Sequence, residues 1–387
     1  MTDECRTRIE ISKKALIHNL GQIKKLCPGS NLGVVVKSNA YGHGAEIVAS
    51  VMQEMPDVDC LFVAGIREGL ALRAAGISKP VLALAYYDAP LAEAILGNIE
   101  LTVYEADPVL IKELDAVARD CGAQVRVHLK VDTGLARLGV RPDEVMGCIE
   151  LLARYAPRIE CVGIFTHLAD ANSADPTYTC EQLDRFNAVL RAVRARAVHI
   201  PVWHALSSGG LAQVFLLGAH KKDYVYTTVR AGTSVYGLWK SDVQKNAVQA
   251  CDPSIELKQV LTWKARILSV IFVPAGRSIG YARTYVTPRD AAVALISIGY
   301  ADGYPRSLSG NAYVMIGSAY APVVGTVSMN ITAVDVTGIA DAVAGADATL
   351  IGDASGITAD AVAAYAGIYH NELLARLNPL IERHLVE

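Results

Sequence analysis

The sequence lacks the marks of a nucleic-acid-binding, membrane or secreted protein. Its 36 lysines and arginines are balanced by 39 acidic residues, giving a formal net charge of −3, and no basic cluster is interleaved with aromatic residues. No apolar run approaches the roughly 18 residues of a membrane span, and the opening MTDECRTRIE is too polar for a signal peptide. We therefore expect no nucleic-acid partner, no membrane partner and a cytoplasmic location.

Signals for disulfides and metal sites are also missing. The chain has eight cysteines but no C-x-x-C pair, and several of them lie in apolar runs such as DCLFVAG (59–65) and IECVGIF (159–165). Cysteines in such runs usually act as small core residues. This usage indicates a reducing compartment and predicts no disulfide framework and no metal site.

What the sequence does have is apolar residues, 52% of the chain, grouped over its first two thirds into short runs that alternate with helical patterns. Near-continuous apolar runs are typical of parallel strands buried on both faces. Eight such runs predict strands, at 31–37, 60–65, 80–85, 99–104, 125–132, 161–167, 201–207 and 226–232. Their alternation with helices predicts a (β/α)8 TIM barrel. A doubly wound open sheet remains the alternative, because the number of strands does not prove closure.

The alternation of predicted strands and helices ends after Trp239. Residues 241–254 are polar, have no strong period and are predicted to be a linker. The runs beyond them are β-rich and are separated by glycine and proline turns, which predicts an all-β domain. We therefore expect an N-terminal barrel over residues 1–245 and a C-terminal all-β domain over residues 246–387.

Six charged or imidazole side chains stand at or just after the ends of predicted barrel strands: Lys37, Lys130, Arg137, His167, His204 and Arg230. In (β/α)8 enzymes the catalytic residues come from the carboxyl ends of the strands. Each of these residues alone has an ordinary structural explanation, such as a solvated cap or an ion pair. Together they predict a cationic mouth that binds an anion, and the turns SSGG (207–210) and RAGTS (230–234) offer backbone N–H groups suited to a phosphate.

Motifs along nearly the whole chain resemble those of the alanine racemases. VVVKSNAYGHGA (34–45) is very close to the family's pyridoxal-phosphate (PLP) lysine motif, and HLKVDTGLARLG (128–139), SIGYARTY (278–285) and VVGTVSMNITAVDV (323–336) follow in the family's order. The resemblance implies PLP as cofactor, a barrel with a β-rich second domain, and a homodimer whose active sites are shared between chains. Non-catalytic PLP carriers usually lack the second domain, and the typical motifs of the PLP decarboxylases are not found.

The resemblance also implies the catalytic groups. Lys37 would hold PLP as a Schiff base and act as one base, and Tyr281, supplied by the partner subunit, would act as the other. Tyr300 and Met329, also from the partner subunit, would lie near the substrate, as would Arg137. Two bases on opposite faces can remove and return the α-proton of an amino acid without moving it. The implied function is a PLP-dependent isomerase that interconverts L- and D-alanine and supplies D-alanine for peptidoglycan.

The remaining family positions would surround the cofactor. Four residues would bind the phosphate: Tyr41, Ser208, Gly232 and Thr233. Three would form a hydrogen-bonded group at the ring nitrogen: Arg230, His167 and His204. Arg137 would face the ring hydroxyl. Lys130 matches a lysine that is often carbamylated in the family, where the added carboxylate orients the arginine equivalent to Arg137.

One position departs from the family pattern. The family usually has a tyrosine just before a glutamate near the C-terminus, and alignment on Glu372 puts Asn371 there, with Tyr369 out of register. That tyrosine normally touches the phosphate and crowds the substrate side chain, so Asn371 is assigned to the cofactor site. A smaller residue with an amide donor and acceptor would admit a hydroxymethyl side chain. The alternative function is therefore a serine/alanine racemase with serine as a significant substrate.

Overall fold

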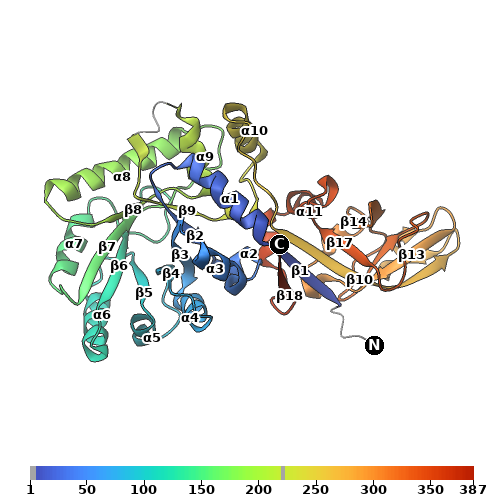
Figure 1. The fold of residues 1–387 in the computed structure, drawn as a ribbon, viewed down its shortest axis with the longest axis horizontal. Helices are drawn as coiled ribbons and strands as arrows, with labels where there is room; N and C mark the ends of the chain where they lie inside the picture. The colour runs from blue at the N-terminus through green and yellow to red at the C-terminus, as the bar shows by residue number, and fades with distance from the viewer. Residues whose placement is uncertain (1–5, 219–222) are drawn as a thin grey trace. The chain divides into compact units, whose positions relative to one another are not determined.

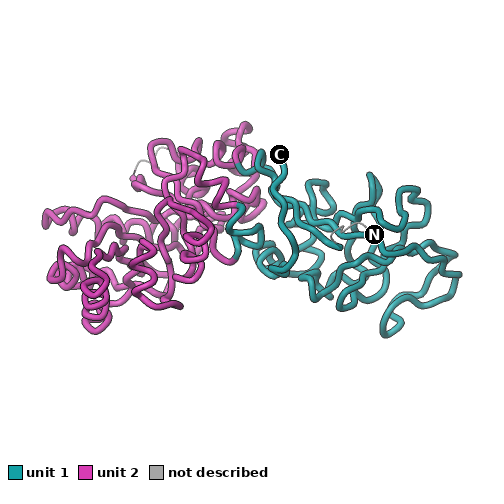
Figure 2. Tube along the Cα trace, turned by 60° about the horizontal axis from the view of Figure 1, so that its bottom comes forward, with its two compact units in different colours: residues 1–16, 39–47, 258–387 teal, residues 17–38, 48–257 magenta. Residues whose placement is uncertain are grey.

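The computed structural model describes residues 6–218 and 223–387. They fall into two compact units, drawn in different colours in Figure 2. The barrel unit comprises residues 17–38 and 48–257, and the β unit comprises residues 39–47, 258–387 and the chain up to residue 16. Within the described ranges, no helix is long and apolar enough to cross a membrane.

The barrel unit contains one parallel sheet with the strand order β8-β7-β6-β5-β4-β3-β2-β9 (Figure 1). Its strands are β2 (Asn31–Val35), β3 (Val58–Gly65), β4 (Val81–Tyr86), β5 (Ile99–Val103), β6 (Val125–Lys130), β7 (Ile159–Phe165), β8 (Val202–His204) and β9 (Thr228–Ala231). A parallel bridge between Ser207 and Arg230 joins the two ends of this order, so the sheet is a nearly closed barrel. The predicted (β/α)8 fold is confirmed, and the open-sheet alternative is wrong.

The helices before residue 220 are α1 (Lys13–Leu26), α2 (Lys37–Tyr41), α3 (Ala45–Glu54), α4 (Ile66–Ala74), α5 (Leu91–Leu96), α6 (Pro108–Cys121), α7 (Val145–Ala153), α8 (Thr177–Ala195) and α9 (Ser208–Leu216). In α8 the residues Leu183, Phe186, Leu190 and Val193 are buried. Their spacing puts them on one face of the helix. Burial of each such side chain contributes about 1.5–3 kcal/mol, so this face fixes α8 against its neighbours.

The predicted linker is partly a helix, α10 (Asp242–Cys251). Ser241 caps it, since its hydroxyl accepts a hydrogen bond from the backbone N–H of Gln244 at 3.3 Å. Only Gln244 and Val248 are buried in α10, and Val248 packs with Ala212 and Ile255. The sequence pattern did not indicate this helix, because only two of its positions are buried and one of them is a glutamine. This helix depends on tertiary packing.

The β unit is built on a sheet with the order β15-β14-β17-β10-β1-β18, which β13 and β16 extend through β10. Its elements are β1 (Thr7–Ser12), β10 (Leu261–Val273), β11 (Ser278–Ile279), β12 (Tyr285–Val286), β13 (Ala291–Ile296), β14 (Tyr313–Ile316), β15 (Ala319–Pro322), β16 (Thr332–Asp335), β17 (Asp347–Ile351), α11 (Ala359–Ala366), α12 (His370–Ala375) and β18 (Glu382–Val386). The N-terminal strand β1 pairs antiparallel with β10 and parallel with β18. Strand β1 therefore lies outside the barrel unit, although residues 1–245 were predicted to form the barrel domain. The predicted division between the two domains at residue 245 stays a prediction.

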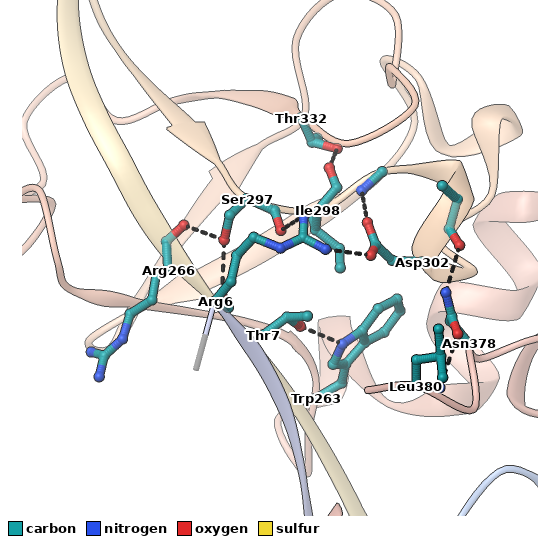
Figure 3. A network of polar contacts seen from close by, with 12 residues as sticks. Arg6, Thr7, Trp263, Arg266, Ser297, Ile298, Asp302, Thr332, Asn378 and Leu380 are labelled. Atoms are coloured by element: carbon teal, nitrogen blue, oxygen red, sulfur yellow. Dashed lines mark hydrogen bonds and ion pairs between the residues drawn. The ribbon is translucent and has the colours of Figure 1, made fainter. Parts of the chain in front are cut away.

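A polar network in the β unit holds the loop that carries Tyr300 (Figure 3). Arg6 Nη2 donates to Asp302 Oδ1 at 2.7 Å, and its Nη1 donates to the carbonyl of Ser297 at 3.1 Å. The other Asp302 oxygen accepts from the backbone N–H of Gly299 at 3.0 Å. Because Asp302 is buried, this pairing compensates a charge that would otherwise be costly. A residue from the start of the chain thus fixes a loop near residue 300.

Candidate functional site

Lys37 follows strand β2 and begins an unusual turn. Residues Ser38 to Tyr41 all have φ between +52° and +54°, a left-handed conformation that costs about 1–2 kcal/mol per non-glycine residue. Glu68 holds the start of this turn, because its carboxylate accepts from the backbone N–H of Ser38 at 2.6 Å and from that of Ala64 at 2.7 Å. Strained backbone that its surroundings hold in place is typical of functional sites.

The half-buried amine of Lys37 lies among other cations. Burial lowers its pKa, Arg137 and Arg230 lower it further, and the carboxylate of Glu68 opposes them. Burial and like charges both disfavour the protonated amine. A larger fraction of Lys37 is therefore neutral near pH 7, and the neutral amine is the form that acts as a nucleophile or base.

Arg230, on β9, is 3% exposed, and acceptors hold its guanidinium on two sides. Nη1 donates to His204 Nδ1 at 2.9 Å. Nη2 donates to the carbonyls of Thr166 at 2.8 Å and Ala205 at 3.1 Å, and to His167 Nδ1 at 3.2 Å. Among the hydrogen bonds of the described residues none uses Nε, which leaves an N–H for a ligand atom. Burial lowers the pKa of Arg230 to about 9, so it stays protonated at neutral pH.

The two histidines beside Arg230 are neutral. Burial lowers the pKa of His167 and of His204 well below the usual value, and the charge of Arg230 lowers both further. A neutral imidazole accepts a hydrogen bond at one of its nitrogens, so both rings serve Arg230 as acceptors. The structure thus brings together the three residues that the resemblance grouped at the ring nitrogen.

Ser208, Gly232 and Thr233 meet where helix α9 begins. Ser208 Oγ accepts from the backbone N–H of Gly232 at 2.9 Å and lies 2.9 Å from Ser234 Oγ. Thr233 is 1% exposed, yet its hydroxyl has no hydrogen-bond partner in the part of the chain that the structure describes. A buried hydroxyl without a partner is costly, and a phosphate at this helix N-terminus would supply one. These three residues, called the phosphate cradle below, therefore offer donor groups suited to a phosphate.

Lys130 and Arg137 complete the cationic mouth. Lys130 ends β6 and is 5% exposed. Burial, followed by the charges of Arg137 and Arg230, lowers its pKa to about 8. The loop after it wraps around Asp132, whose carboxylate accepts from the backbone N–H groups of residues 134–137. This loop leaves the side chain of Arg137 exposed and within electrostatic range of Lys130.

Three predicted site residues form a second group, on the β unit. Tyr281, Tyr300 and Met329 are 73%, 46% and 55% exposed. The backbone N–H of Tyr300 donates to the carbonyl of Ser328 at 3.1 Å, and the hydroxyl of Thr326 donates to the carbonyl of Tyr281 at 3.2 Å. One short segment that includes Met329 therefore connects all three.

Tyr41 and Asn371 also belong to the β unit. Burial raises the pKa of the Tyr41 hydroxyl to about 12, and the nearby Tyr369 contributes to the rise, so the hydroxyl keeps its proton and remains a donor. Asn371 lies in α12, and its Oδ1 is buried without a hydrogen-bond partner among the described residues. A buried amide oxygen without a partner is rare and invites a ligand contact.

Sequence reasoning missed Glu68 and also Glu100 and His128, which lie in a chain of hydrogen bonds that begins at Arg230. Nothing in the sequence singled out Glu68, because an acidic residue in the first turn of a helix, here α4, is an ordinary stabilising feature. His128 carried a signal, since it lies two residues before Lys130 and so shares its face of β6. Glu100 carried another, because a carboxylate inside the apolar run IELTV needs a partner when it is buried.

The barrel mouth fits PLP. It combines an amine of lowered pKa for the aldehyde, an arginine with an N–H for the ring nitrogen, and a cradle with an unpartnered hydroxyl for the phosphate. No group of three or more His, Cys, Asp or Glu side chains within residues 6–218 and 223–387 could hold a metal ion.

Comparisons with known proteins find relatives along the whole chain. Residues 11–240 match the family model for the N-terminal domain of alanine racemase, and residues 260–385 match that for the C-terminal domain. The chain is 36% identical to an alanine racemase of Desulfovibrio desulfuricans over 380 residues, which cover 98% of this chain and 97% of the relative. It is 38% identical to one of Symbiobacterium thermophilum over 379 residues, covering 97% and 96%.

Solved structures of alanine racemases also resemble nearly the whole chain. The alanine racemase of the D-cycloserine-producing Streptomyces lavendulae has a TM-score of 0.88 and 30% identity, over 99% of this chain and 98% of that one. The alanine racemase of Bartonella henselae, solved with covalently bound pyridoxal phosphate, has a TM-score of 0.81 and 25% identity, over 99% and 100%.

Proposed function

The chain belongs to the alanine racemase family, and on that premise we propose that Lys37 and Tyr281 carry the two proton transfers of its reaction. It is a PLP-dependent enzyme that interconverts L- and D-alanine. This reaction requires one proton to leave the α-carbon on one face and another to arrive on the opposite face. The observation that carries the proposal is the placement of Lys37 at a mouth that also holds the buried Arg230 and the phosphate cradle, where burial and the neighbouring cations lower its pKa.

The barrel residues would bind the cofactor and use it. Bound PLP would delocalise the negative charge that remains when the α-proton departs. Lys37 would hold the cofactor and, once the substrate has displaced it, take or return the proton on one face. Arg230 would leave the ring nitrogen unprotonated, because a guanidinium cannot accept a proton. The hydroxyls of Ser208 and Thr233 would bind the phosphate together with Gly232, and Tyr41 would be a further donor to it.

Tyr281 would serve the opposite face from a second subunit. The exposure of Tyr281, Tyr300 and Met329 supports a homodimer in which each subunit lends these residues to the barrel mouth of its partner. Such sharing follows the two-fold symmetry of most dimers, in which each contact occurs twice. The substrate would be a small amino acid, bound between Arg137 and these partner residues.

Lys130 would be carbamylated. With a pKa of about 8 it supplies a neutral amine that can attack carbon dioxide, releasing one proton and gaining a carboxylate. That carboxylate would pair with Arg137 and turn one cation of the mouth into an anion. Asn371 would line the cofactor site with its unpartnered Oδ1. Serine as a substrate finds no support in the comparisons, and the cellular role would be cytoplasmic supply of D-alanine for peptidoglycan.

Incubation of the purified holoenzyme with L-alanine in deuterated water tests the function. We expect D-alanine, deuterium at the α-carbon and no release of carbon dioxide. Lys37→Ala should abolish both signals, whereas Lys112→Ala, at an exposed position of α6, should change neither. D-Alanine that forms without α-deuterium, or full activity of Lys37→Ala, would contradict the proposal.

A further inference from the structure

A buried chain of hydrogen bonds leads from Arg230 into the barrel interior. Arg230 Nη1 lies 2.9 Å from His204 Nδ1, and His204 Nε2 lies 2.9 Å from His128 Nδ1. His128 Nε2 in turn lies 2.9 Å from Glu100 Oε2. None of these four residues is more than 7% exposed. The other Glu100 oxygen pairs with Arg126 at 2.8 Å, so the chain ends at a compensated carboxylate.

The donors and acceptors of this chain fit together in one direction. A guanidinium only donates, so His204 Nδ1 must accept, and neutral His204 then carries its proton on Nε2. That N–H donates to His128 Nδ1, which leaves the proton of His128 on Nε2. This second N–H points at Glu100, and an ionised carboxylate only accepts. The tautomers are thus assigned from the network, with a fixed donor at one end and a fixed acceptor at the other.

We propose that Glu100 and His128 are positioning residues, which fix the tautomer of His204 and thereby the setting of Arg230. This inference rests on the proposed role of Arg230 at the ring nitrogen. Glu100 and Arg126 are the second residues of β5 and β6, whereas Arg230 lies near the carboxyl end of β9. The hydrogen-bond chain therefore connects the charged Glu100 in the interior of the barrel to Arg230, the residue proposed to face the cofactor.

The charge states support this direction. Burial alone would raise the pKa of Glu100, but the hydrogen bond from His128 and the charge of Arg126 outweigh it, so the pKa is lowered and the carboxylate is ionised. Burial and the charge of Arg230 keep His204 neutral. Glu100 and His204 are thus in the charge states that the hydrogen-bond chain requires.

The packing holds both rings in orientation. A Cβ at Gly163 would overlap the imidazole of His128, so only glycine at this position of β7 leaves room for the ring. Phe165 stacks on His204 with centroids 4.5 Å apart and an angle of 10° between the planes. If either imidazole were turned over, a ring carbon would replace a nitrogen that now forms a hydrogen bond. Because the ring orientations are fixed, the tautomer is the property that Glu100 can control.

Removal of the Glu100 carboxylate has a definite consequence. Without an acceptor for its Nε2–H, His128 can carry its proton on Nδ1 and donate it to His204. Neutral His204 must then carry its own proton on Nδ1, where it opposes the N–H of Arg230. Two facing donors repel, so Arg230 would shift from its place.

Imidazole ¹⁵N–¹H spectra of enzyme labelled in its histidines, with and without PLP, test the assignment. In wild type we expect protonated Nε2 and bare Nδ1 for both His204 and His128, assigned by the signals lost in His204→Asn and His128→Asn. Glu100→Leu should shift His204 toward the Nδ1–H tautomer and lower kcat on the order of tenfold, with little change in KM. Glu100→Gln, whose amide oxygen can still accept from His128, should restore the tautomer and most of kcat.

A matched control is Glu160→Leu, at an exposed position of β7, the strand that pairs with β6, which should change neither spectrum nor kcat. His204 signals that stay unchanged in Glu100→Leu, or an equal loss of kcat in the Leu and Gln variants, would overturn the proposal. A bare Nε2 on His204 in wild type would overturn it even if Glu100→Leu does not fold. Wild type that forms no D-alanine would instead refute the proposed function, whatever the spectra show.

Discussion

The barrel mouth was predicted from residues at the ends of strands, whereas the β-unit group was predicted from the family resemblance alone, and the two are built differently. Arg230 and His204 are 3% and 0% exposed and are held by side-chain hydrogen bonds. Tyr281 and Tyr300 are 73% and 46% exposed, and their loops are held mainly through the backbone. The difference teaches that most of the proposed cofactor site is organised within the barrel unit, whereas the proposed second proton-transfer group is exposed on the β unit and would need a partner to cover it.

Removal of the Tyr281 hydroxyl should have the largest effect, because it separates proton transfer by the β-unit group from proton transfer by Lys37 at the barrel mouth. In Tyr281→Phe we expect racemisation to fall by about 10³-fold, because one of two general bases is lost. Exchange of the α-proton with deuterated water should persist for one enantiomer, since Lys37 still serves its own face. The measurement is α-deuterium by mass spectrometry, starting from each enantiomer separately. Equal loss of exchange for both enantiomers would mean that the two faces are not served separately.

Mixed dimers test whether the two groups meet between subunits. Lys37→Ala and Tyr281→Phe chains, unfolded together and refolded, should form hybrid dimers in which one site carries both changes and the other carries none. Activity should recover to about a quarter of wild type, because half of the dimers are hybrids with one intact site each. Either variant refolded alone is the control. If the mixture is no more active than the controls, the sites are not shared.

The phosphate cradle predicts a smaller effect, confined to the barrel. Thr233→Val should weaken PLP binding by about tenfold, because a hydrogen bond to a charged group is lost, while the unliganded chain should be no less stable. Thr179→Val is the matched control, since the Thr179 hydroxyl on α8 is also buried without a partner among the described residues. It should leave PLP affinity unchanged in a titration of the unliganded protein. Equal PLP affinities of the two variants would remove Thr233 from the cradle.

The smallest effect concerns pH. Lys130 has a pKa of about 8 in the folded chain, against an ordinary value of 10.5. Between these values the unfolded chain binds the proton and the folded chain does not, so this group makes the free energy of unfolding rise with pH. In buffer free of carbon dioxide, the Tm of wild type should rise relative to that of Lys130→Met by a few degrees from pH 8 toward pH 10. A Tm difference that is constant with pH would show that the amine is not desolvated.

Much of the barrel could be predicted because its strands are short, apolar and buried on both faces. The predicted run at 99–104 contains β5 (Ile99–Val103), and the run at 125–132 contains β6 (Val125–Lys130). The strand β1 was missed, because Thr7–Ser12 alternates between buried and half-buried residues over only six positions. Its partners on β10 lie 250 or more residues away, and local sequence carries no signal of such pairing.

The sequence by itself determined the residue types at the mouth. The carboxyl ends of parallel strands in a barrel meet at one rim, so Lys37, Lys130, His204 and Arg230 had to converge once the barrel was assigned. Only the tertiary structure decided how they are coupled. The left-handed turn after Lys37 is held by Glu68, which lies on helix α4. The direction of the hydrogen-bond chain from Arg230 to Glu100 depends on donor and acceptor atoms from different strands. Hydrogen-bond direction is a property of atoms in space, and no pattern along one strand contains it.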